Sequence, residues 1–469
     1  MDFLRGGEIV LNSTSLNKTS FTKNMLIIAV PIMVQSLITA SVNLIDTIMI
    51  GKLGESAIAS LGITNQMFML FSILAMGIFT GVGVLISQYW GRKDIARIRA
   101  FTSLQVKLGI GLALIFVLIG GLIPERFMSL FTSDSSVIDL GASYLRLVII
   151  GYIPFAISGG FGVASRSIGK TVIPMIASVS ALLINVVLNY GLIYGNLGMP
   201  ELGVRGAAIA TSIARITEML VILISVYSFD KTLALRIKEL IVWNSRAFKE
   251  VFVPMSQVVL NDLCWALGMI VYTMLYGRIG TGAIASIQIM TTIQQLFMIA
   301  IVAISSAACV MVGGLVGEGS YEEAISASWY FLKVVFAVSI ILSFFVGFGT
   351  ESIMSFFNVS QGVAESSKLL LFITAVIMPV RGLEILFIIG ILRGGGDAKG
   401  ALKIEMFTMW VIGVPLCYVG AVIFKWNVEI VYLLVATEEF AKLALSYTRF
   451  KKGKWINNFT EKNEMIEAA

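Results

Sequence analysis

Histidine is absent from this 469-residue sequence, and charged residues make up only 13% of it. Without histidine the chain has no histidine metal site, no Ser–His catalytic pair and no histidine pH sensor. A soluble domain carries about 25% charged residues, so an ordinary soluble protein is excluded. Because hydrophobic residues make up 57% of the chain, we expect most of it to lie in a lipid bilayer.

Cysteine is also rare, and the positive charge is spread out. The three cysteines, Cys264, Cys309 and Cys417, lie in apolar stretches without metal-ligand spacing, so we expect neither a disulfide nor a metal site from them. The net charge of +6 comes from basic loops, which membrane proteins use to fix their orientation. The sequence therefore predicts no nucleic-acid partner.

Long apolar stretches dominate what remains. Windows of about 20 apolar residues predict twelve transmembrane helices. The predicted spans are 25–50, 59–87, 101–123, 140–165, 173–195, 206–229, 251–276, 283–316, 326–349, 369–392, 401–424 and 428–448. An open sheet edge cannot lie in lipid, and the sequence lacks the alternation of a barrel. The predicted fold class is an all-α polytopic membrane protein.

One segment occurs twice. The ten residues Gly51–Ser60 return as Gly277–Ser286, which is 226 residues later and close to half the chain. Six helices per half give both halves the same orientation, so we expect two six-helix lobes related by a pseudo-twofold axis along the membrane normal. Two similar halves that rock against each other around a central site are typical of a transporter.

The distribution of Lys and Arg sets the predicted topology. Basic residues gather at both ends of the chain and in the loops after the even-numbered spans, apart from the acidic loop after span eight. Both termini are therefore predicted to be cytoplasmic, in a multi-pass protein of the cell (inner) membrane. The predicted segments are a cytoplasmic N-terminal segment 1–24, an N-lobe 25–229, a cytoplasmic inter-lobe loop 230–250, a C-lobe 251–449 and a cytoplasmic tail 450–469.

Asp46 and Asp262 lie within the spans and have no basic residue one helical turn away. Burying a carboxylate costs at least about 2.5–3.5 kcal/mol on insertion scales, so it persists where it is paired, faces water or has a function. Asp46 in the first span is predicted to bind a proton or a cation such as Na⁺; a polar contact near the helix end is the alternative. Asp262 near the middle of the seventh span, beside Asn261, is interpreted as an unpaired carboxylate able to exchange a proton or bind Na⁺.

Other polar residues in the spans are arranged in pairs. Arg215 with Glu218 and Arg381 with Glu384 are three residues apart, which places each pair on one helix face and favours local charge neutralisation. Asn185 and Asn189 are one turn apart in the fifth span, and with Thr211 they can supply neutral oxygens beside a carboxylate. The segment 164–171 resembles a phosphate-binding loop but lacks its first glycine and follows no strand, so no nucleotide site is expected.

Taken in order, these segments resemble the multidrug and toxic compound extrusion (MATE) family over about residues 25–450. The resemblance is carried by the order of the motifs together with the twelve spans and the duplication. The motifs are Pro31-x-x-x-Gln35, Asp46-Thr-Ile-Met-Ile-Gly51-x-x-Gly54, Ser87-Gln-Tyr-Trp-Gly-Arg-Lys-Asp94, Arg166-x-x-Gly169, Asn185-x-x-x-Asn189, Gly203-Val-x-Gly-Ala-Ala-x-Ala-Thr211 and Leu392-Arg-Gly-Gly-Gly-Asp397.

The resemblance implies a secondary antiporter with a central cavity, which exports organic, often cationic, compounds in exchange for H⁺ or Na⁺. By the same resemblance, Asp46, Asn185, Asn189 and Thr211 match the family's ion-coupling positions, although the second asparagine is an aspartate in some members. Asp262 matches a position that is often glutamate. A substrate or second cation site is predicted at Gln35, Asn261, Asp262 and Glu384, although Glu384 does not align with the family's acidic position.

The expected partners are small organic substrates and the lipid bilayer. We expect no nucleotide and no cofactor beyond the coupling ion, and we expect the protein to be a monomer. One alternative is a flippase for a lipid-linked glycan precursor, which would need a strongly basic cavity for pyrophosphate. A membrane enzyme is the third hypothesis, but histidine, metal ligands and nucleophile motifs are all lacking. The coupling ion, H⁺ or Na⁺, stays open at this point.

Overall fold

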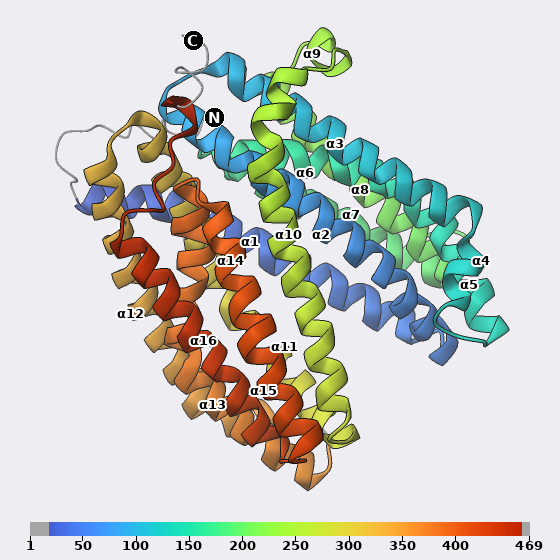
Figure 1. Ribbon diagram of the computed structural model, residues 1–469. Helices are drawn as coiled ribbons and strands as arrows, with labels where there is room; N and C mark the ends of the chain where they lie inside the picture. The colour runs from blue at the N-terminus through green and yellow to red at the C-terminus, as the bar shows by residue number, and fades with distance from the viewer. Residues whose placement is uncertain (1–17, 356, 358, 462–469) are drawn as a thin grey trace. The chain divides into compact units, whose positions relative to one another are not determined.

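The computed structural model describes residues 18–355, 357 and 359–461, and every regular element in these ranges is a helix (Figure 1). The predicted terminal segments 1–24 and 450–469 therefore lie partly outside the described residues. The helices of the first half are α1 (Lys18–Gly51), α2 (Glu55–Gly91), α3 (Ile95–Leu122), α4 (Pro124–Ser129), α5 (Ser135–Val148), the 3₁₀ turn η1 (Ile149–Gly151), α6 (Tyr152–Ser167), α7 (Val172–Tyr194), α8 (Val204–Phe229) and α9 (Ile237–Ile241).

The second half is helical as well, with three π-helical segments. Its elements are α10 (Ser245–Gly277), α11 (Thr281–Glu318), α12 (Tyr321–Met354), α13 (Gln361–Ile385), η2 (Leu386–Leu392), α14 (Ala398–Phe407), η3 (Thr408–Gly413), α15 (Val414–Tyr418), η4 (Val419–Ile423) and α16 (Val428–Lys451). The segments η2, η3 and η4 are π-helical. Such bulges are rare and often occur at functional sites.

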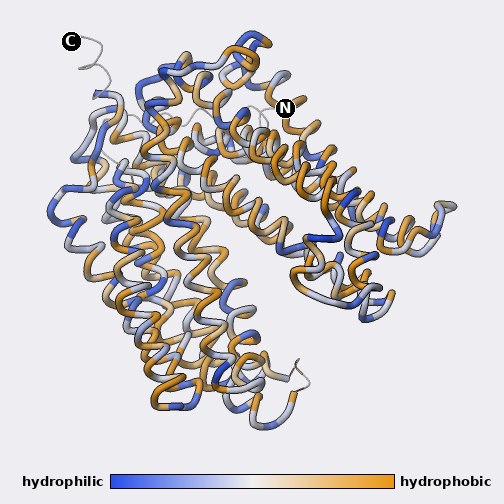
Figure 2. The backbone as a smooth tube through the Cα atoms, turned by 45° about the vertical axis from the view of Figure 1, so that its right-hand side comes forward, coloured by the Kyte–Doolittle hydropathy of each residue, from blue (hydrophilic) through white to orange (hydrophobic). Residues whose placement is uncertain are grey.

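Eleven helical stretches in the described ranges are long and apolar enough to cross a membrane, and each coincides with one of the first eleven predicted spans. Figure 2 shows hydrophobic residues along most of the helices and hydrophilic residues concentrated at their ends and turns. The twelfth predicted span is α16, which has 24 residues but carries Glu429, Glu438, Glu439 and Lys442. The last three are buried among other helices. The all-helical membrane fold is confirmed.

The chain divides into two compact units, which are described separately. Unit 1 contains Val30–Ile86 and Lys93–Val259. Unit 2 contains Ser87–Arg92 and the chain from Leu260 onward, together with residues 18–29 at the start of α1. The lobe boundaries that the sequence analysis placed at residues 229 and 251 stay predictions.

The repeated segment forms the same turn in both halves. Gly51 ends α1 and Gly277 ends α10, and the next helix begins four residues later in each case. The glycine just before that helix has a positive φ in both copies, +112° at Gly54 and +151° at Gly280. Residues with a β-carbon rarely adopt such angles. The duplication therefore preserves a turn that requires glycine.

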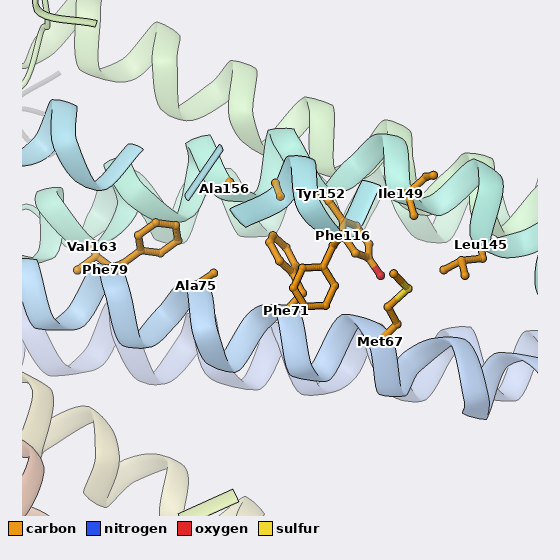
Figure 3. Close-up of a cluster of buried hydrophobic side chains, with 11 residues drawn as sticks. Met67, Phe71, Ala75, Phe79, Phe116, Leu145, Ile149, Tyr152, Ala156 and Val163 are labelled. Atoms are coloured by element: carbon orange, nitrogen blue, oxygen red, sulfur yellow. The ribbon is translucent and has the colours of Figure 1, made fainter. Parts of the chain in front are cut away.

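An aromatic core holds unit 1 together. Phe71 of α2 and Tyr152 of α6 are stacked, with ring centroids 4.8 Å apart and an interplanar angle of 8°. Phe116 of α3 packs onto Phe71 at 5.4 Å, and Figure 3 shows the three rings meeting between these helices. The same core extends to Leu145 and Ile149. The helices α5 and α6 also pack against α8, which carries several of the polar residues of unit 1.

The glycine turn gives a stability prediction with an internal control. We expect Gly54→Ala to lower the stability of the protein by about 1–2 kcal/mol, because alanine is strained at φ +112°. The control is Gly62→Ala, within α2 with nothing within 4 Å of its added β-carbon, and it should be neutral or stabilising by up to about 1 kcal/mol. Thermal unfolding of the purified variants measures both. Equal stability of Gly54→Ala and the unchanged protein would contradict the strained turn.

Candidate functional site

Asp46 lies in α1 and meets two asparagines of α7. The amide nitrogen of Asn189 donates hydrogen bonds to Oδ1 of Asp46 and, at 3.1 Å, to Oδ1 of Asn185. The asparagines lie on one helix face because they are four residues apart, and they are almost fully buried. Among the described residues no ion pair is formed by Asp46. Its carboxylate is therefore held by one neutral amide group, that of Asn189.

Two buried amide atoms of these asparagines lack partners. Within the described residues, Nδ2 of Asn185 and Oδ1 of Asn189 are buried without a hydrogen bond. The Thr211 hydroxyl is also buried, and it is within hydrogen-bonding reach of Tyr144. Thr211 belongs to α8, which packs along α7. Buried polar groups are normally satisfied, so the unpaired amide atoms next to Asp46 are available to a ligand such as water or an ion. The structure thus brings the four predicted ion-coupling residues into one unit.

A positive charge lies near this group without pairing to it. Arg215 of α8 attracts the Asp46 carboxylate electrostatically, but its Nη1 donates to Oε2 of Glu218 at 3.1 Å. The guanidinium also lies over the rings of Phe68 and Phe155, 5.4 and 5.1 Å from their centroids. The predicted pairing of Arg215 with Glu218 is confirmed. These contacts hold the cation at a fixed position beside the Asp46 group.

Gln35 belongs to a chain of hydrogen bonds within unit 1. Nη1 of Arg166 donates to Oε1 of Gln35 at 2.8 Å, and Nε2 of Gln35 donates to Oγ of Ser178 at 3.0 Å. The Ser178 hydroxyl donates in turn to Oε1 of Glu218 at 2.9 Å. This chain joins α6, α1, α7 and α8 and ends on the carboxylate that holds Arg215. Gln35 therefore lies in unit 1, whereas Asn261, Asp262 and Glu384 belong to unit 2.

The interpretation of Asp262 as an unpaired carboxylate is wrong. Oδ1 of Asp262 in α10 accepts a hydrogen bond from Nη2 of Arg393 at 2.6 Å, and the two form an ion pair. Arg393 directly follows η2 and is 8% exposed. Local spacing does not reveal this pair, because the two residues are 131 positions apart in the sequence. The neighbouring Asn261 is buried, and its Oδ1 has no partner among the described residues.

Arg381 pairs across helices and not with Glu384 as the local spacing predicted. Its guanidinium donates to Oε1 of Glu439 in α16, at 2.6 Å from Nη2 and 3.0 Å from Nε. Glu384 is buried and lies 3.6 Å from Nζ of Lys442. Glu405 and Glu439 were missed as site residues, although both are acidic residues inside predicted spans and could have been singled out on that ground.

Comparison with known proteins identifies the chain. The family model MatE matches it twice, over residues 31–191 and 258–419, and the two matches begin 227 residues apart. The chain belongs to the MATE family. It is therefore a multi-pass membrane transporter and not an enzyme. The double match confirms the predicted duplication, whose offset was 226 residues.

Relatives of this MATE protein match it over nearly its whole length. It is 25% identical to an uncharacterized transporter of Bacillus subtilis, YisQ, over 96% of this chain and 98% of the relative. It is 24% identical to a probable multidrug resistance protein, NorM, of Thermotoga maritima, over 92% of this chain and 93% of the relative. The Vibrio cholerae MATE transporter VcmN, solved as a point mutant, is 17% identical and superposes with a TM-score of 0.86 over 95% of this chain and all of that chain.

The ion pair in unit 2 predicts how Asp262 behaves when it is changed. Asp262→Asn should destabilise the MATE protein by about 1.5–3 kcal/mol, because Arg393 loses its charged hydrogen-bond partner. Combining Asp262→Asn with Arg393→Met should restore stability, since removing both charges is much less costly than leaving one. Thermal unfolding in detergent measures the single and double variants. A single variant as stable as the unchanged protein would show that the ion pair contributes nothing.

Proposed function

We propose that this MATE protein is a secondary antiporter that exports organic cations in exchange for H⁺ or Na⁺ held at Asp46. The observation that supports this most is the half-buried Asp46 carboxylate, hydrogen-bonded by a neutral amide among unpaired polar atoms. By contrast, Asp262 pairs with Arg393, and Glu218 pairs with Arg215. A carboxylate without a paired cation in a membrane span gains most from binding a proton or a metal cation.

Both ions suit the atoms at this position. A proton on Asp46 removes the buried charge and turns the carboxylate into a carboxylic acid that can donate a hydrogen bond. After a flip of the Asn189 side-chain amide, Oδ1 of Asn189 can accept this hydrogen bond. Na⁺ takes oxygen ligands, and the Asp46 carboxylate, Oδ1 of Asn189 and Oγ1 of Thr211 are oxygens of this kind. In either case the carboxylate, the two asparagines and Thr211 form the coupling site.

Transport follows if ion and substrate stabilise different conformations. Neutralising Asp46 weakens its hold on Asn189 and alters the packing of α1 against α7, whereas the ionised form restores that contact. An ion gradient then shifts the populations of the two conformations, and the substrate shifts them the other way. We propose that the protein works as a monomer in the cell (inner) membrane, with both termini in the cytoplasm. Its transport does not use a nucleotide.

Organic cations as substrates are part of this proposal. Several relatives are named as probable multidrug resistance proteins, whereas a Pyrococcus furiosus transporter of similar fold, 18% identical with a TM-score of 0.82, is described as having reversed pocket polarity. In this chain the basic side chains Arg215, Arg381 and Arg393 each pair with a carboxylate. Because these three cations are paired, they offer little free positive charge to a pyrophosphate lipid, which the flippase alternative requires.

The proposal predicts the behaviour of Asp46→Asn. In proteoliposomes with an imposed pH or Na⁺ gradient, applied separately, ethidium efflux by this variant should be slower by about tenfold or more than by the unchanged protein, within the 5–150-fold range typical of coupled sites. The matched control is Asp134→Asn, an exposed helix cap that keeps its hydrogen-bonding oxygen, and it should transport normally. The gradient that accelerates efflux identifies the coupling ion.

Two results would contradict the proposal. Gradient-driven efflux at the normal rate by Asp46→Asn would remove Asp46 from the coupling site. The second contradicting result concerns the unchanged protein. If neither gradient accelerates its efflux of ethidium or other organic cations, cation export driven by H⁺ or Na⁺ is excluded. Membrane insertion and thermal stability of Asp46→Asn are measured alongside efflux. If both are normal, a loss of transport reflects the missing carboxylate and not misfolding.

A further inference from the structure

Six charged side chains meet inside unit 2 at helices α13, α14 and α16, which run side by side in Figure 1. They are Arg381, Glu384, Glu405, Glu438, Glu439 and Lys442. All except Arg381 are at most 8% exposed. The proposed coupling site at Asp46 uses none of these groups, and Glu384 is the only one among the predicted site residues.

Lys442 lies at the centre of this cluster. Its Nζ is 3.0 Å from Oε1 of Glu405, 3.0 Å from Oε1 of Glu438 and 3.6 Å from Oε2 of Glu384. Arg381 is engaged by Glu439 alone, through two hydrogen bonds to Oε1. Two cations therefore face four carboxyl groups. If all six groups were ionised, the cluster would carry two uncompensated negative charges.

Such an excess is unfavourable in a buried site. Ions removed from water lose several kcal/mol of solvation each, and like charges at close range oppose each other's ionisation. The Tyr272 hydroxyl donates a hydrogen bond to Oε2 of Glu438, which stabilises that carboxylate without adding positive charge. Protonating one carboxyl group lowers the excess directly.

One atom shows where that proton belongs. Among the described residues, the buried Oε2 of Glu439 receives no hydrogen bond from any N–H or hydroxyl group. The Glu384 side chain is within hydrogen-bonding reach of Glu439. Two carboxylates cannot hydrogen-bond each other, but a protonated carboxyl donates to an ionised one. A proton on Glu384 supplies the missing donor and also removes one of the excess charges.

We propose that Glu384 and Glu439 hold one proton between them, which makes this pair a second protonation site, in unit 2. Glu384 carries the proton and donates it in a hydrogen bond to Oε2 of Glu439, while Arg381 keeps Glu439 ionised through its other oxygen. The pairing follows the pattern of two carboxyl groups that share a proton because both cannot ionise at close range. A metal ion is disfavoured, because the Lys442 ammonium already lies among the carboxyl oxygens.

The surrounding groups are compatible with this assignment. The other titratable side chains that interact with members of the cluster or border it are neutral in their usual forms and add no compensating cation. They are Cys264, Tyr272, Tyr276, Cys417 and Tyr432. The π-helical segment η2 begins two residues after Glu384, and η3 begins three residues after Glu405. A β-carbon on Gly413 of η3 would clash with the Tyr272 hydroxyl and the Glu438 carboxylate, so the glycine at this position allows their close approach.

Infrared spectroscopy tests the proposal without transport. The purified protein in lipid nanodiscs should show, at neutral pH, the C=O stretch of a protonated carboxyl group that Glu384→Gln removes. The matched control Glu365→Gln changes an exposed acid on the same helix and should leave that signal intact. A band of equal intensity in Glu384→Gln and the unchanged protein would overturn the proposal. Because the readout does not depend on efflux, it is independent of whether Asp46 couples transport.

Thermal unfolding supplies a second test, which asks whether Glu384 is protonated or ionised. Glutamine resembles a protonated glutamate and keeps a donor for Glu439, so Glu384→Gln should unfold within a few degrees of the unchanged protein. Glu405→Gln and Glu439→Gln should unfold at clearly lower temperature, because each removes an ionised partner, of Lys442 and of Arg381 respectively. A loss of stability in Glu384→Gln as large as in Glu405→Gln would mean that Glu384 is ionised, and the proposal would be wrong.

Discussion

The cost of burying charge in a membrane protein determines how the polar residues of this chain are arranged. Each buried ion needs a partner of opposite charge, a full set of hydrogen bonds or a bound ion. Most charges meet this requirement through partners far away in sequence, such as Arg393 for Asp262 and Glu439 for Arg381. Asp46 differs from the buried acids Glu218 and Asp230 of unit 1, which pair with Arg215 and Lys170, because the neutral amide of Asn189 holds its carboxylate. Its chemistry follows from that incomplete compensation.

The duplicated scaffold and the polar sites have diverged from each other. The repeated turn keeps a positive-φ glycine in both halves, at Gly54 and Gly280, because the geometry excludes other residues there. The charges are not repeated in this way. Unit 1 places a single carboxylate beside two asparagines, whereas unit 2 gathers four glutamates around Lys442 and Arg381. A common framework thus carries two different arrangements of acidic groups, and only the framework follows the repeat.

The sequence predicted the elements of this fold well because membrane spans depend on local composition. Eleven spans and the pairing of Arg215 with Glu218 follow from residues close together in the chain, and the duplication follows from the similarity of two short segments. The partners of Asp262 and Arg381 could not be found this way, because each lies on another helix and its position depends on packing. For Asp46 the family resemblance suggested Asn189 as a neighbour, and the structure supplied the hydrogen bond.

Ion release on substrate binding tests most directly whether Asp46 holds the coupling ion. Ethidium is added to the purified protein in weakly buffered solution, and released H⁺ and Na⁺ are followed with an indicator dye and a sodium electrode. If Asp46 holds the coupling ion, the unchanged protein releases H⁺ or Na⁺ as ethidium binds, and Asp46→Asn binds ethidium without releasing that ion. Equal ion release from Asp46→Asn and the unchanged protein would show that Asp46 does not hold the coupling ion.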